Sequence, residues 1–115
     1  MYYSATLRFI VLVDNGRPRR RNSHYDDVYV FRARSTRDAF RKALKLGRAA
    51  QTRYRNVYGQ RVRWAFVSIE ALKPVGRTLV NTEVASRGHT IVARKPVPFG
   101  ARFTPAKSRP TEVAR

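Results

Sequence analysis

The sequence predicts an α+β fold, in which a mainly antiparallel β-sheet carries one helix on a face, in the order ββαβββ. Three observations favour it. Apolar residues alternate with period two in several segments, one segment between them has helical spacing, and turn-forming residues separate the segments. With 115 residues, of which 43% are hydrophobic, the chain is long enough to build one domain with a modest core.

A first strand is expected over residues 2–13, because alternate residues there are apolar and would share a face: Tyr3, Ala5, Leu7, Phe9, Val11 and Val13. Asp14-Asn15-Gly16 indicates a turn, since Asn and Gly tolerate the positive φ of tight turns. Residues 17–22 then read as a basic loop, and residues 28–33 as a second strand.

The helix is expected to begin after Ser35, whose hydroxyl can accept from first-turn amides, with Asp38 favouring the positive helix end. It should run to about Thr52. Its sheet-facing residues recur at helical spacing: Ala39, Phe40, Ala43, Leu44, Gly47 and Ala50. The opposite side carries a basic stripe, Arg37, Arg41, Lys45 and Arg48. The stripe has no acidic partner at i±4, which favours contact with anions over a merely solvated face.

Residues 54–60 read as a turn into a central strand over residues 62–72, which is apolar on both faces and covered on one side by the helix. Val62, Trp64 and Phe66 should lie on one face, opposite Ala65, Val67 and Ile69. Residues 73–76 indicate another turn. Residues 78–85 and 89–94 are expected to form a hairpin around Ser86-Arg87-Gly88.

The composition changes after Arg94, so we expect one domain over residues 1–94 and an extended basic, Pro-rich tail over residues 95–115. The tail holds four of the six prolines, and Pro disfavours both helices and central strands. If the tail is ordered, it must be held by its own domain through Phe99 and Phe103, or by a partner.

Several motifs resemble a bacterial family of unknown function. The most specific is Tyr54-x-Asn56-x-Tyr58-Gly59-Gln60-x-Val62-x-Trp64-x-Phe66-Val67. The others are Tyr2-Tyr3-Ser4-Ala5, Ala33-x-Ser35-x-x-x-Ala39-x-x-x-Ala43 and Thr82-Glu83-Val84-Ala85-Ser86. The resemblance covers about residues 2–86 and implies one compact domain, but no activity. The basic loop, the basic stripe and the tail depart from the family pattern.

Charge is the strongest functional signal, because 25 Lys and Arg oppose seven Asp and Glu for a formal net charge of +18. A fold this basic repels itself, so we expect a polyanionic partner, namely nucleic acid, an acidic protein or an anionic membrane face. The alternative is drift in an Arg-rich proteome, given 20 Arg and five Lys. No apolar run is long enough to span a membrane, no signal peptide is indicated, and the absence of Cys is compatible with a cytoplasmic protein.

The candidate anion-binding residues are basic side chains of the loop, the stripe, the turn at residues 54–60 and the central strand: Arg17, Arg19, Arg20, Arg21, Arg37, Arg41, Lys45, Arg48, Arg55 and Arg63. Tyr54 and Tyr58 are candidate rings for base stacking, whereas Trp64 is expected in the core.

The sequence contains few residues that could act in catalysis. His24 and His89 have no metal-ligand spacing, and Glu83 is best explained by a salt bridge to a neighbouring Arg. We therefore expect no cofactor and no enzyme, but a protein that binds nucleic acid. The alternative is an immunity or antitoxin-type inhibitor of an acidic effector. A basic ribonuclease toxin is a minor alternative, using Tyr54, Arg55, Arg63, Glu83 and His89. The sequence does not indicate an oligomeric state.

Overall fold

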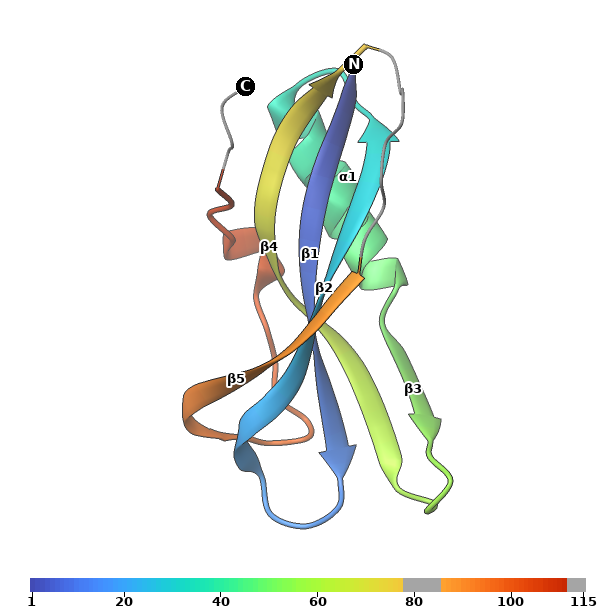
Figure 1. Cartoon of the computed structure of the whole chain (residues 1–115), viewed down its shortest axis with the longest axis vertical. Helices are drawn as coiled ribbons and strands as arrows, with labels where there is room; N and C mark the ends of the chain where they lie inside the picture. The colour runs from blue at the N-terminus through green and yellow to red at the C-terminus, as the bar shows by residue number, and fades with distance from the viewer. Residues whose placement is uncertain (78–85, 112–115) are drawn as a thin grey trace.

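The computed structural model describes residues 1–77 and 86–111, and its sheet has the strand order β3-β4-β1-β2-β5 (Figure 1). The strands are β1 (Tyr2–Asp14), β2 (Arg19–Arg32), β3 (Thr52–Arg55), β4 (Arg61–Gly76) and β5 (Ser86–Val97). Helix α1 (Thr36–Ala49) follows β2, and a short 3-10 helix, η1 (Pro105–Lys107), follows β5. All neighbouring strands pair antiparallel. The predicted α+β fold and element order are therefore confirmed.

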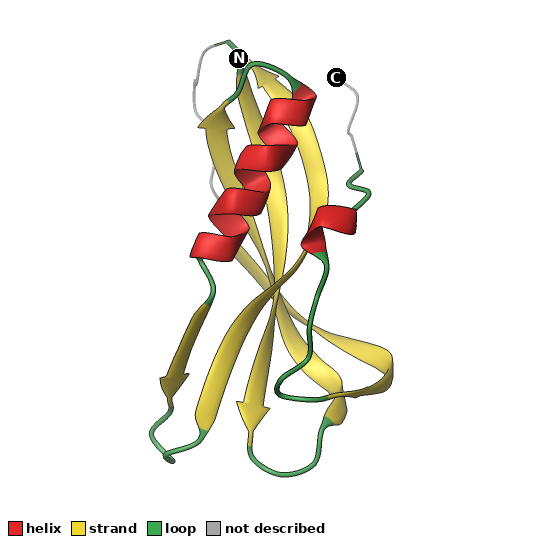
Figure 2. Cartoon of the chain, turned by 180° about the vertical axis from the view of Figure 1, so that it is seen from behind, coloured by secondary structure: helices red, strands yellow, loops and turns green. Residues whose placement is uncertain are grey.

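Strand β1 lies at the centre of the sheet, and its predicted apolar face packs under α1, which crosses that side of the sheet in Figure 2. Leu7 and Phe9 are buried there against Phe66 of β4. The helix approaches through its small residues Ala39, Ala43 and Gly47, all of which are buried. A Cβ atom on Gly47 would lie 2.4 Å from the Phe66 ring, so only glycine permits this approach.

The helix begins as predicted. The Ser35 hydroxyl accepts from the Asp38 backbone N–H at 3.1 Å, and the Asp38 carboxylate accepts from the Arg34 N–H at 3.0 Å. The first bond satisfies an amide group that the first turn leaves without a helical partner, and the second ties the residue before the cap to that turn. The helix ends at Ala49, earlier than the predicted Thr52, because Thr52 already starts β3.

The predicted basic loop is wrong in part, because β2 begins at Arg19 and continues through the predicted second strand. Pairing with β1 extends to Val11↔Ser23, beyond the apolar part of β2. Strand β1 is long enough to pair its backbone with the polar residues at the start of β2, whose side chains remain in water. The polarity of these side chains alone therefore predicts a loop where the backbone forms a strand.

The predicted faces of the central strand are correct only in its first half. Two register shifts against β1 leave Val67 and Glu70 without opposite residues, so Ile69 faces α1 together with Phe66. Such bulges reverse the alternation of faces. The strand also continues through the predicted turn at residues 73–76. Strand β3 pairs only with residues 61–64 of β4, so β4 is an edge strand at Pro74. A proline is tolerated there because no neighbouring strand on that side needs its missing N–H.

The predicted turn at residues 86–88 is wrong, because these residues start β5 and pair with β2, as in Gly88↔Tyr25. The other strand of the predicted hairpin, over residues 78–85, lies outside the described residues. The turn predicted over residues 54–60 is shorter, since its first two residues belong to β3.

The segment after β5 packs against the sheet. Strand β5 ends at Val97, beyond the predicted domain boundary at residue 94. Phe99 and Phe103 pack on Ile10, Leu12 and Ala65, on the sheet face opposite the main core. Of the two anchors considered for this segment, its own domain is therefore the one observed.

The same C-terminal segment covers the edge of β4 that β3 leaves open. The Leu72 N–H donates to the Thr111 carbonyl at 3.2 Å, and the Ile69 N–H donates to the Ser108 hydroxyl at 2.9 Å. Nearer β3, the Phe66 N–H donates to the Gln51 side chain at 3.1 Å. Uncovered edge donors would invite pairing with other chains, so these contacts protect the sheet.

Candidate functional site

Four of the five acidic side chains of the described residues form ion pairs, and the fifth, Asp27, accepts from the Ser86 hydroxyl at 2.6 Å. Asp26 and Glu70 both pair with Arg8, at 2.9 and 3.1 Å, and Asp14 pairs with Arg61. Asp38 lies within 4.0 Å of three cations, Arg34, Arg41 and Lys42. Most Arg and Lys side chains within residues 1–77 and 86–111 consequently have no carboxylate partner in that part of the chain.

The helix stripe is exposed, as predicted, along the outer side of α1: Arg37, Arg41, Lys45 and Arg48. No acidic residue lies at i±4 from the stripe, but Arg41 lies 3.6 Å from Asp38, three residues earlier, so one stripe residue does have an acidic neighbour. The stripe ends at Arg48, next to the end of α1 at Ala49 and shortly before β3 begins at Thr52.

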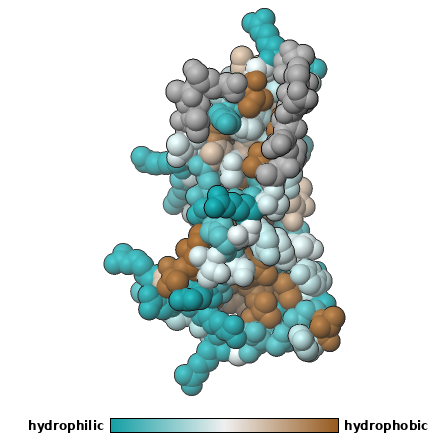
Figure 3. Space-filling view, viewed as in Figure 1, coloured by the Kyte–Doolittle hydropathy of each residue, from teal (hydrophilic) through white to brown (hydrophobic). Residues whose placement is uncertain are grey.

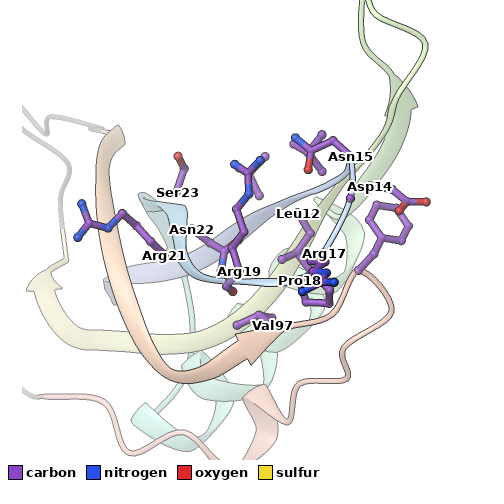
Figure 4. Close-up of a pocket in the computed structure, with 14 residues that line it drawn as sticks. Leu12, Asp14, Asn15, Arg17, Pro18, Arg19, Arg21, Asn22, Ser23 and Val97 are labelled. Carbon is purple, nitrogen blue, oxygen red and sulfur yellow. Dashed lines mark hydrogen bonds between the residues drawn. The ribbon is translucent and has the colours of Figure 1, made fainter.

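The end of the β1–β2 hairpin forms a small pocket of about 230 Å³ (Figure 4). The two strands separate beyond Val11↔Ser23, and Val97 and Phe99 contribute to the lining between them. Arg17, Arg19 and Arg21 line this pocket, and Figure 4 shows Arg21 extending away from Arg17. Arg20 is directed elsewhere and donates to the Ala93 carbonyl at 2.8 Å.

A larger hollow, of about 430 Å³, lies between the end of α1, strand β4 and the C-terminal segment. A second hollow of about 300 Å³ adjoins it and shares Gln51 and Arg63 with it. We call the two together the basic groove, because their charged lining residues are all cations: Arg48, Arg53, Arg63, Arg102 and Lys107.

Arg63 anchors the groove. It is half-buried, and its guanidinium donates to the carbonyls of Phe99 and Ala101 at 3.0 and 2.6 Å. Burial and the neighbouring charge of Arg53 lower the pKa of Arg63. A cation that lacks a carboxylate and lies beside a second cation raises the local positive potential. The predicted site residue Arg63 is therefore both a structural contact and part of the groove.

Strands β3 and β4 present four arginines on one face, since Arg53 pairs with Arg63 and Arg55 pairs with Arg61. The Phe99 ring lies under two of them, 4.8 Å from the Arg61 guanidinium carbon and 6.0 Å from that of Arg53. Such contacts attract a cation to the ring face. Arg55, another predicted site residue, donates to the Gly59 carbonyl at 2.7 Å and so supports the following turn.

The two candidate stacking rings differ. Tyr58 is 83% exposed, whereas Tyr54 is 49% exposed and its hydroxyl accepts from the Trp64 indole N–H at 3.3 Å. Trp64 stacks on Tyr25, with ring centroids 4.7 Å apart, and packs against the main core as predicted.

The ribonuclease set is not brought together. Tyr54 lies on edge strand β3 and His89 on the opposite edge strand, β5, about 19 Å away at the usual strand spacing. His89 instead stacks near His24, at 6.1 Å between ring centroids. Glu83 lies outside the described residues. Among the residues that the structure describes, no group of three His, Cys, Asp or Glu side chains could hold a metal ion.

Residues 2–86 match a family described as a domain of unknown function, DUF4288. The chain belongs to this family. The match covers the region of the motifs, so the DUF4288 region includes α1 and strands β1–β4, whereas nearly all of β5 and the C-terminal segment lie beyond it. No curated protein and no solved structure matches the chain. In the described part of the chain, no helix is long and apolar enough to cross a membrane.

The groove combines the DUF4288 region with the segment outside it. Arg48, Arg53 and Arg63 come from the family region, whereas Arg102 and Lys107 come from the C-terminal segment. Arg53, Arg102 and Lys107 are not among the site residues predicted from the sequence. The available signal was the pair Phe99 and Phe103, which marked that segment as able to pack on its own domain.

Proposed function

We propose that the protein is a non-catalytic binding protein for a polyanion, with nucleic acid as the leading partner, and that the basic groove is the main contact. One observation carries the proposal: five cations line the groove, and no acidic side chain among the described residues does. Clustered like charges destabilise the folded protein, whereas an anionic ligand converts the same charges into binding free energy.

A polymeric anion is favoured over a small one because the cationic surfaces are distributed. Arg48 belongs both to the helix stripe and to the groove, so the two are continuous. The β1–β2 hairpin end adds Arg17, Arg19 and Arg21, on a molecule 48 Å in its longest dimension. A small anion would occupy one of these surfaces, but a phosphate backbone can contact several and gains little base selectivity from them.

The groove is tested by the triple substitution Arg53→Gln, Arg102→Gln and Lys107→Gln. Arg63 is kept, because it holds the C-terminal segment. The matched control removes the same charge from the opposite edge strand, through Arg87→Gln, Arg94→Gln and Lys95→Gln. Titration of labelled single-stranded and duplex oligonucleotides at low salt measures the affinity.

We expect the groove variant to lose at least about tenfold more affinity than the control. Equal losses would mean that net charge alone drives binding and would contradict the groove. If the wild type binds no oligonucleotide at low ionic strength but copurifies with one acidic protein, the nucleic-acid proposal fails and an inhibitor of an acidic, cytoplasmic effector replaces it.

A further inference from the structure

The tip of the β3–β4 hairpin carries the two most exposed large hydrophobic side chains of the described residues, Val57 at 93% and Tyr58 at 83%. The hairpin lies at the end of the molecule away from the N-terminus in Figure 1. In Figure 3, hydrophobic surface gathers in this half of the molecule, with hydrophilic side chains projecting around it. Neither side chain of the tip contributes to a core cluster.

The tip is nevertheless firmly held. The Asn56 side-chain oxygen accepts from the N–H groups of Tyr58 and Gln60, both at 3.0 Å, and its amide donates to the Gln60 side chain at 2.9 Å. Gly59 adopts φ +75°, a conformation that other residues rarely adopt. Tyr58 contributes only its backbone to this network. The turn therefore fixes the backbone from which the ring projects, so a contact made by the ring costs side-chain entropy but little backbone entropy.

Cations flank the tip and connect it to the basic groove. Arg55 lies on one strand of the hairpin and Arg61 on the other, at directly paired positions. Arg53, which lines the groove, is three residues before Asn56, about 10 Å along the strand. A nucleic-acid strand that extends from the groove along this hairpin would reach the exposed ring.

We propose that Tyr58, with Val57 beside it, stacks on an unpaired base, so that the protein prefers single-stranded nucleic acid to a duplex of the same length. This inference rests on the proposed function. Bases in a duplex already stack on both faces, whereas an unpaired base can turn toward a protein ring while cations hold its phosphates.

The test compares Tyr58→Ala with Tyr58→Phe, which keeps the ring. Titrations use a short labelled single strand, the matching duplex, and a single strand with abasic sites that keeps the phosphates. Tyr58→Ala should lose at least about fivefold affinity for the normal single strand, with little change on the duplex or the abasic strand. Tyr58→Phe should bind like the wild type, and the salt dependence should be the same in all three proteins, because no phosphate contact is removed.

Wild-type affinity of Tyr58→Ala for the single strand would overturn the inference, and so would equal losses on single strand, duplex and abasic strand. If the groove variant weakens binding while Tyr58→Ala does not, the polyanion function stands and the stacking role fails. If the wild type binds none of these oligonucleotides at low salt, both the polyanion-binding function and the stacking role of Tyr58 are wrong. Thermal melting of each variant confirms that the hairpin, whose network does not use the Tyr58 side chain, is intact.

Discussion

Gly47 lies where the helix and the sheet are closest, and its missing side chain sets their separation. Replacing Gly by Ala in an exposed helix usually stabilises it by about 1 kcal/mol. Here the new Cβ would lie 2.4 Å from the ring of Phe66, which is 2% exposed and packs in the main core, so the ring or the helix would have to shift. We therefore expect Gly47→Ala to destabilise the fold by about 1–3 kcal/mol, as overpacking does.

Urea unfolding measures this effect. Gly100→Ala is the control, because its Cβ would meet nothing within 4 Å and its φ is not positive. A Gly47→Ala protein as stable as the wild type would mean that α1 shifts away from the sheet without cost.

His24 links stability to pH. Burial first, and the charges of Arg8 and His89 next, lower the pKa of His24, while the Asn22 carbonyl and Asp26 act in the opposite direction. Well above pH 6.5, which is about the usual pKa of His, the residue is neutral in both states and stability does not depend on it. As the pH falls below that value, the unfolded chain takes up a proton more readily than the folded one, so the free energy of unfolding decreases until the lowered pKa is reached.

We accordingly expect the wild type to lose stability between about pH 7 and pH 5.5, and His24→Gln to lose less. Urea unfolding at several pH values in that window measures both, above the range in which carboxylates titrate. A parallel decline in the two proteins would assign the pH dependence to other groups.

At the scale of elements, the contribution of the helix stripe to binding can be tested without disturbing the fold. Changing Arg37, Arg41, Lys45 and Arg48 to Gln keeps helix propensity nearly constant and removes repulsion along one face. Only Arg41 has a carboxylate within 4.0 Å among the described residues, and the pair is exposed. Stability should hold or rise slightly, while affinity for oligonucleotides falls.

Circular dichroism melting and the oligonucleotide titration measure the two effects. The comparison is Arg17, Arg19, Arg20 and Arg21 changed to Gln. Comparable losses from both sets indicate distributed phosphate contacts, and a strongly unequal loss indicates a protein partner. Unchanged affinity in the stripe variant would show that this face of the helix contacts only solvent.

The C-terminal segment is expected to stabilise the sheet. Truncation after Val97 removes Phe99 and Phe103 from the second core cluster and the contacts of Ser108 and Thr111 with β4. We expect a loss of at least about 2 kcal/mol of stability, together with aggregation through the uncovered edge. Calorimetry and light scattering measure the two effects. Ser108→Ala, which removes one edge contact, should show a smaller loss, and an unchanged melt after truncation would contradict this role.

Elements with strong local signals were predicted well, and elements fixed by distant partners were not. The cap at Ser35 and the alternation of β1 are local, so the sequence alone indicated them. A strand was expected over residues 89–94, but β5 extends beyond both of these ends because β2 offers it an edge, and β4 changes faces at Val67 because of its register with β1. Neither pairing leaves a pattern within its own segment.

The same distinction explains the candidate site. Arg48 and Tyr58 were predicted from a helix face and a turn, both local features. Arg102 and Lys107 reach the groove only because the segment after Val97 folds back over β4. Composition indicated the charge of the site, but not which cations converge.

For the whole molecule, a net charge of +18 predicts a steep dependence of binding on salt. The logarithm of the association constant for a duplex should fall linearly with the logarithm of salt concentration, with a slope of about −0.9 for each phosphate contacted. The groove variant removes up to about three phosphate contacts, so its slope should be less steep by up to about 2.7. A slope near zero with retained affinity would indicate that hydrophobic contacts, rather than charges, hold the partner.

The position of β1 has a consequence for synthesis of the chain. β1 is made first, yet one of its edges is closed only by β4, which ends about 60 residues after β1. At the usual rate of translation, roughly 3–12 s pass between completion of the two strands, whereas a hairpin such as β1–β2 forms in microseconds. Throughout that interval the nascent chain carries an open apolar strand edge, so chaperones have access to β1. Protease digestion of ribosome-bound chains arrested before and after β4 should show this edge disappearing.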